Sequence, residues 1–215
     1  IAYLSRKARE MLDAAGWESA TITVSNALDE YLIRDMWMQD AKIDAFGVGE
    51  RLITARSEPV FGGVYKLVAV EDESGKIIPK IKISENVGKI TTPHFKKLYR
   101  FYGRDTGKAI ADYICVHDET VDDSDKMTIF DPEATWKRKE VYHFTARELL
   151  VPIFRNGKLV YSRPSLEEIR KYCAEQVDTL WDEVKRFDNP HRYYVDLSQK
   201  LYDIKQELLT KNSGK

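Results

Sequence analysis

Residues 1–50 alternate between helical and strand patterns, and this alternation limits the possible folds more than any other feature of the chain. Apolar residues spaced three and four apart predict an amphipathic helix over 1–15, which Gly16 ends. A β-branched strand at 21–24, a second helical pattern and a second short strand at 42–46 follow in turn. Such alternation indicates parallel strands joined by crossover helices, as in an α/β barrel or a doubly wound sheet.

The pattern changes after Pro59, where strand patterns follow one another without intervening helices. The alternation of polar and apolar residues is typical of half-exposed antiparallel strands. We therefore expect an antiparallel meander, in a different layer from the first segment. The predicted strands are 63–70, 80–83, 98–102 and 109–116.

Two local motifs organise the last third of the chain. Asn156-Gly157 lies between two apolar runs and predicts a β-hairpin. Ser165 and Glu168 have the spacing of a capping box, so we expect a helix that begins there and ends near Asp188. A second amphipathic helix is expected over 194–209.

Composition indicates an ordinary globular protein of the cytoplasm. Hydrophobic residues make up 43%, charged residues 32%, and the net charge is −1, so neither nucleic acid nor a membrane is an expected partner. Charged residues appear as early as Arg6-Lys7 and there is no initiator Met, which argues against a signal peptide. We expect a fragment of a longer protein, because it opens directly on an amphipathic helix whose apolar face must pack against other residues. Cys115 and Cys173 are expected to be buried free thiols. The acidic loop 118–125 is expected to be solvated rather than to hold a cation.

Gly47-Val48-Gly49 is the strongest candidate for a ligand site. It follows a predicted strand, where α/β proteins bind ligands, and glycines let backbone amides approach an anion such as phosphate. A tight turn with no ligand is the alternative interpretation. Arg51 and Arg56 lie near enough in sequence to hold a phosphate, or are two solvated arginines.

Other polar features are weaker candidates. Ser25-Asn26 ends the preceding strand and would share a barrel rim with the glycine loop, unless one of the two residues caps the next helix. Gly62-Gly63 makes either a tight bend or room for a ligand. The four histidines lack metal-ligand spacing, so no metal site is predicted.

At this point the residues resemble a known family. Residues 43–49, with Leu52-Ile53-Thr54 and 62–68, are similar to a hallmark run of nicotinate phosphoribosyltransferases. The similarity spans the whole chain and is closest to the bacterial branch. It continues through the runs 79–86, 89–91, 99–100, 145–150 and 189–198.

The resemblance implies an α/β fold, α+β overall, of the type II phosphoribosyltransferases. Residues 1–60 would be the last units of an irregular α/β barrel and would carry the phosphate-binding glycine loop. Residues 61–118 would be antiparallel strands returning to a second domain. Residues 119–215 would be a C-terminal extension with a hairpin and two helices.

The resemblance also implies a reaction. Nicotinate would displace diphosphate from phosphoribosyl pyrophosphate, with Mg²⁺ on the diphosphate and ATP as a co-substrate, to form nicotinate mononucleotide for NAD biosynthesis. The expected partners are these substrates, the N-terminal half of the same enzyme and a second copy in a homodimer. By position, the residues that would line the phosphoribosyl site are Ser25, Asn26, Gly47, Gly49, Glu50 and, more loosely, Arg56.

The family's catalytic residues are absent from these 215 residues and are expected upstream of Ile1, where we predict the sequence Asp-Ser-Gly-Asp. Two other functions compete with this one. The first is a phosphoribosyltransferase for nicotinamide or quinolinate, because the arginines that select the base would also lie upstream. The second is a non-enzymatic module that binds phosphosugars through the glycine loop.

Overall fold

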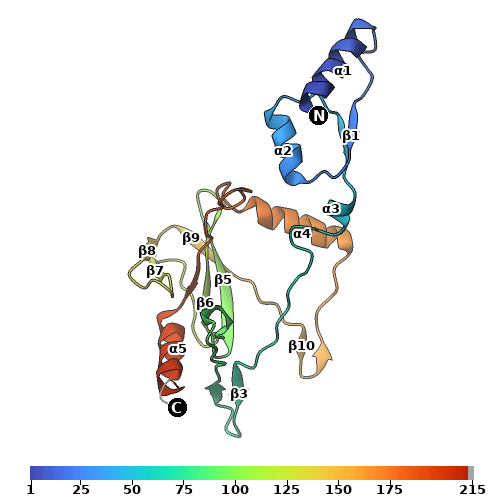
Figure 1. Cartoon of the computed structure of the whole chain (residues 1–215). Coiled ribbons are helices and arrows are strands. Elements are labelled where there is room, and N and C mark those ends of the chain that lie inside the picture. Colours follow the sequence, from blue (N-terminus) through green and yellow to red (C-terminus); the bar gives the residue numbers. More distant parts are fainter. Residues whose placement is uncertain (213–215) are drawn as a thin grey trace. The chain divides into compact units, whose positions relative to one another are not determined.

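The computed structural model describes residues 1–212 (Figure 1). The chain forms two compact units, Ile1–Val64 and Tyr65–Lys215, and each is described by itself. Among the described residues, no helix is both long enough and apolar enough to cross a bilayer.

The first unit confirms the predicted alternation of helices and strands. Its two strands are parallel, and Val24 pairs with Phe46 in their register. Trp37 packs edge-on against Phe46, with ring centroids 6.1 Å apart. The elements are α1 (Ala2–Ala14), β1 (Thr23–Ser25), α2 (Glu30–Met38), β2 (Ala45–Gly47) and α3 (Glu50–Ile53).

The first unit buries few apolar side chains. Leu28 and Met36 are buried, but Leu4 and Met11 on α1 are 66% and 72% exposed. Ser5 ties α1 to the segment before β2, because its hydroxyl accepts a hydrogen bond from Lys42 N at 3.0 Å. The apolar face of α1 therefore has the character of a surface that packs against further protein.

The second unit is built on a four-stranded sheet of order β12-β6-β5-β9. The predicted pair β5 and β6 is antiparallel, as expected, and β12 runs parallel to β6. The sheet strands are β5 (Lys96–Gly103), β6 (Ala109–Val116), β9 (Phe144–Glu148) and β12 (Val195–Leu197). The unit also contains three two-stranded hairpins: β3 (Ala69–Glu71) with β4 (Ile77–Pro79), β7 (Met127–Phe130) with β8 (Arg138–Val141), and β10 (Phe154–Arg155) with β11 (Lys158–Leu159).

The core of the second unit is aromatic. Phe101 and Phe144 are fully buried, with ring centroids 4.7 Å apart, and Ile129 and Cys115 pack in the same cluster. A separate cluster joins Val116 of β6 to Leu201 of α5 (Gln199–Asn212). Cys115 is buried as predicted, but the prediction was wrong for Cys173, which is exposed on α4 (Leu166–Asp178).

The strands predicted at 63–70 and 80–83 are shorter or displaced. Only residues from Ala69 onward form β3, and its partner β4 ends at Pro79. The turn between them sets this register, because one carboxylate oxygen of Asp72 accepts hydrogen bonds from the backbone of both Ser74 and Lys76. The two strands pair only close to this turn, and residues 63–68 and 80–83 do not form regular strands.

Helix α4 begins as predicted, because Ser165 and Glu168 form a complete capping box. It ends ten residues before the expected Asp188, and all its residues are exposed or only partly buried. Its last carbonyls are taken by the sheet: Ala109 N donates to Thr179 O at 2.8 Å, and Lys108 Nζ donates to Asp178 O at 2.8 Å. These contacts satisfy carbonyl groups at the end of α4, and the helix does not continue beyond them.

Candidate functional site

Ser25 and Gly47 lie side by side at the carboxyl ends of the parallel strands β1 and β2. The Ser25 hydroxyl donates a hydrogen bond to Gly47 O at 3.1 Å. A Cβ atom at Gly47 would lie 3.0 Å from Ser25 Oγ and 3.2 Å from Ser25 Cβ, so a side chain at this position would displace Ser25. The structure therefore brings together two residues predicted for the phosphoribosyl site, at the strand ends expected to bind ligand.

Gly49 is the N-cap of α3, and Glu50 is the first residue of that helix. Both are exposed, and no atom lies within 4 Å of where a Cβ of Gly49 would be. Gly49 O accepts hydrogen bonds from Leu52 N and Ile53 N, so its role inside the protein is that of a helix start. The space where a Gly49 side chain would lie is therefore empty, and the phosphate interpretation requires such room beside the loop.

Asn26 forms the turn that leaves β1. Asn26 and Ala27 both have left-handed backbones, with φ of 96° and 49°. The alternative interpretation, that Ser25 or Asn26 caps the next helix, is wrong: the N-cap of α2 is Asp29, whose carboxylate accepts from Leu32 N at 2.9 Å. The polar side chains of Ser25 and Asn26 are thus not used as helix caps.

Arg51 and Arg56 line a cavity of about 360 Å³ together with Asp29 and Ser57. Arg51 forms an ion pair with Asp29, and this contact lowers the pKa of Asp29 in addition to the larger effect of the Leu32 amide. The buried Nε of Arg51 has no hydrogen-bond partner among the described residues. The sequence predicted Arg56 for the phosphoribosyl site only loosely and did not predict that Asp29 lines this cavity. The available signal was the position of Asp29 at the start of a helical pattern, which is typical of an N-cap.

Gly62 and Gly63 lie outside any strand, with nothing within 4 Å of their hypothetical Cβ atoms. Two of the histidines, His94 and His117, stack in the second unit with ring centroids 5.7 Å apart. Within residues 1–212, no three His, Cys, Asp or Glu side chains gather as metal ligands. In the acidic loop, Asp118 pairs with Lys200 at 2.7 Å.

Comparison with known proteins shows the family of the chain. The model of the nicotinate phosphoribosyltransferase C-terminal domain matches residues 95–205, which is more than half of the chain. The chain belongs to the nicotinate phosphoribosyltransferase family. The expected resemblance is thereby confirmed.

Individual relatives extend the match of this nicotinate phosphoribosyltransferase chain to the glycine loop. It is 43% identical to the nicotinate phosphoribosyltransferase of Bacillus subtilis, over 96% of this chain and 42% of that protein. It is 32% identical to the enzyme of the same name from Caenorhabditis elegans, over 99% of this chain and 39% of that protein. The chain therefore spans about two fifths of the length of these relatives.

The crystal structure of human nicotinic acid phosphoribosyltransferase has the same fold in the matching part. The TM-score is 0.64 at 24% identity, over 95% of this chain and 36% of the human chain. The expected fold class, a mixed α/β part of such an enzyme, is confirmed by this likeness. The boundaries expected at 60 and 118 remain a prediction.

Proposed function

We propose that the protein carrying this chain forms nicotinate mononucleotide and diphosphate from nicotinate and phosphoribosyl pyrophosphate, for NAD biosynthesis. The observation that carries the proposal is the family match, joined to a glycine loop that lies open at the ends of two parallel strands. Relatives that match 96% and 99% of this chain bear the name of that enzyme.

The chain's own contribution is to bind the phosphoribosyl group. Amides of Gly49 and Glu50 face the 5′-phosphate, and Ser25 and Asn26 approach it from the neighbouring strand end. Arg56, which lines the cavity with Asp29, adds positive charge. Transfer of a ribosyl group passes through a cationic sugar, so a rigid site that positions the phosphate does more than a strong acid or base.

Mg²⁺ and ATP belong to the proposal as a cofactor and a co-substrate. Mg²⁺ is commonly held by substrate phosphates and one or two carboxylates. The described residues contain no cluster of side chains that would form a metal centre, so we assign no residue of this chain to Mg²⁺. We assign ATP coupling and selection of the base to parts of the longer protein outside this chain, and we propose that the protein is a homodimer.

The test is an assay of the complete natural protein with phosphoribosyl pyrophosphate and each of three bases, with and without ATP. We expect nicotinate mononucleotide from nicotinate, at a rate that rises with ATP. Product from nicotinamide or quinolinate alone would establish the sister activity instead. Binding of phosphoribosyl pyrophosphate without product from any base would support the non-enzymatic phosphosugar module.

A further inference from the structure

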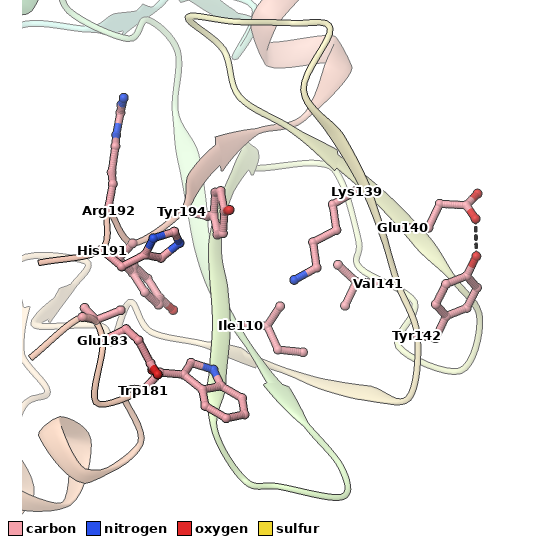
Figure 2. A pocket seen from close by; sticks show the side chains of 12 residues that line it. Ile110, Lys139, Glu140, Val141, Tyr142, Trp181, Glu183, His191, Arg192 and Tyr194 are labelled. Atoms are coloured by element: carbon pink, nitrogen blue, oxygen red, sulfur yellow. Dashed lines mark hydrogen bonds between the residues drawn. The ribbon is translucent and has the colours of Figure 1, made fainter.

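A cavity of about 610 Å³ lies in the second unit, and all of its lining residues come from 110–194, far in sequence from the glycine loop (Figure 2). Its walls come from β6, β8, the turn after α4 and the segment before β12. The volume is in the range of small-molecule sites. The residues that matter for its chemistry are Ile110, Lys139, Trp181, Glu183, His191 and Tyr194.

Two aromatic side chains form the part of the cavity that suits a flat ring. Trp181 and Tyr194 remain 45% and 42% exposed, and Ile110 lies between them in Figure 2. Half-exposed Trp and Tyr rings offer large planar surfaces with little rotamer freedom to lose on binding. The presence of both rings in one cavity favours an aromatic ligand over an aliphatic one.

Backbone contacts hold both aromatic residues in place. Asp112 N of β6 donates to Tyr194 O at 2.9 Å. His191 N donates to Glu183 O at 2.8 Å and joins the segment before β12 to the turn that carries Trp181. The His191 ring packs edge-on against Tyr194, with centroids 6.0 Å apart. The backbone on both sides of the cavity is therefore held in place by contacts within the protein.

Lys139 supplies the charge. Its ammonium lies 5.8 Å from the centroid of the Tyr194 ring and points into the cavity in Figure 2. The ion pairs found among residues 1–212 do not include Lys139. The adjacent Glu140 is occupied by Tyr142, shown by the dashed line in Figure 2, and by Lys126 at 2.9 Å.

We propose that this cavity binds a planar aromatic molecule that carries one anionic group. The ring lies against Trp181 and Tyr194, and the anion pairs with the Lys139 ammonium. Glu183 also lines the cavity and disfavours an anion beside it, whereas Arg192, the other lining cation, is paired with Glu133 at 3.3 Å. A carboxylate on the ring and the phosphate of a nucleoside monophosphate both have this chemistry. The proposal does not depend on the reaction proposed for the protein.

The test uses the complete natural protein labelled with 5-fluorotryptophan and observed by fluorine NMR. The chain has four tryptophans, so its fluorine resonances report on different places, and the Trp181 resonance is identified by its absence from Trp181→Phe. Nicotinate and adenosine 5′-monophosphate are titrated separately, up to about 1 mM. We expect at least one of the two to shift the Trp181 resonance saturably, and the one that does identifies the source of the anion.

Lys139→Met is the decisive variant, and Lys158→Met, on the exposed strand β11, is its matched control. We expect the titration midpoint to rise about tenfold in Lys139→Met, because one charge-assisted hydrogen bond is lost, and to stay unchanged in Lys158→Met. Equal midpoints in Lys139→Met and wild type would overturn the proposal, as would a Trp181 resonance that neither probe moves. Product formation measured on the same samples reports on the catalytic proposal separately.

Discussion

Arg100 and Asp112 form a two-point ion pair across the neighbouring strands β5 and β6. Arg100 Nε lies 2.7 Å from Asp112 Oδ1, and Nη2 lies 2.9 Å from Oδ2. Tyr193 also donates to Asp112 Oδ1 at 3.0 Å, and this carboxylate raises the pKa of the Arg100 guanidinium. Asp112 thus connects the central strands to the segment that leads into β12.

Asp112→Ala should lower the stability of the protein by about 3 kcal/mol, because it leaves the half-buried Arg100 without its partner. The measurement is the free energy of unfolding from urea titration. Asp118→Ala, which breaks the exposed pair with Lys200, is the control and should change stability little. A loss in Asp112→Ala no larger than that of the control would contradict the importance of the Arg100–Asp112 pair.

Gly47 and Gly49 should respond differently to substitution. Gly49→Val has space for its side chain, so the fold should persist, while the Michaelis constant for phosphoribosyl pyrophosphate should rise about tenfold as the valine blocks an amide–phosphate contact. Steady-state kinetics and a melting curve measure the two effects. An unchanged Michaelis constant would argue against the phosphate site.

Gly47→Ala should instead destabilise the first unit, because the new Cβ meets Ser25 at 3.0 Å. Adding Ser25→Gly removes that contact and should restore part of the lost melting temperature. If the double variant melts no higher than Gly47→Ala, the close approach to Ser25 is not the cause.

Asp196 should make the protein less stable as pH rises. Burial raises the pKa of Asp196 from 3.8 to about 6, and the carboxylate of Asp131 adds to this effect while Arg192 opposes it. The folded state then holds a proton that the unfolded state releases, so this group's stabilising effect is complete below about pH 4 and is lost as pH rises through about 6.

Asp196→Asn should remove this dependence and add about 2 kcal/mol to the free energy of unfolding at about pH 8, relative to its effect at about pH 4. Urea titrations of both proteins at the two pH values measure the difference. The same pH dependence in both proteins would assign it to another group.

The two cysteines should differ in reactivity. Burial raises the pKa of the Cys115 thiol to about 11, and the nearby Glu119 carboxylate contributes to the rise, whereas Cys173 is exposed. At about pH 8 a disulfide reagent should modify one thiol quickly in the folded protein and the second only after unfolding. The fast phase should disappear in Cys173→Ser; its persistence would show that Cys115 is accessible.

The features that local chemistry controls could be predicted from the sequence. Asn156 and Gly157 adopt the left-handed backbones of a hairpin turn, and Ser165 and Glu168 bond to each other's backbone, because their partners are only a few residues away. The glycine loop was predicted for the same reason: it depends on a strand end and its next few residues.

Features that depend on distant partners were decided by the tertiary structure. Residues 195–197 were expected to be helical but form β12, which pairs with β6. Ser198 N donates a hydrogen bond to Ile114 O, and Asp112 N donates one to Tyr194 O. Helix α4 ends early because Ala109 and Lys108 take its last carbonyls.

The sequence by itself determined the family, the alternation of helices and strands and the glycine loop, since these follow from neighbouring residues. Only the tertiary structure decided which strands pair with β6, that Asp29 rather than Ser25 or Asn26 caps α2, and that Lys139 lines one cavity with Trp181 and Tyr194. Contacts between residues far apart in the chain leave no periodic signal, because each partner's pattern is satisfied equally well by other neighbours.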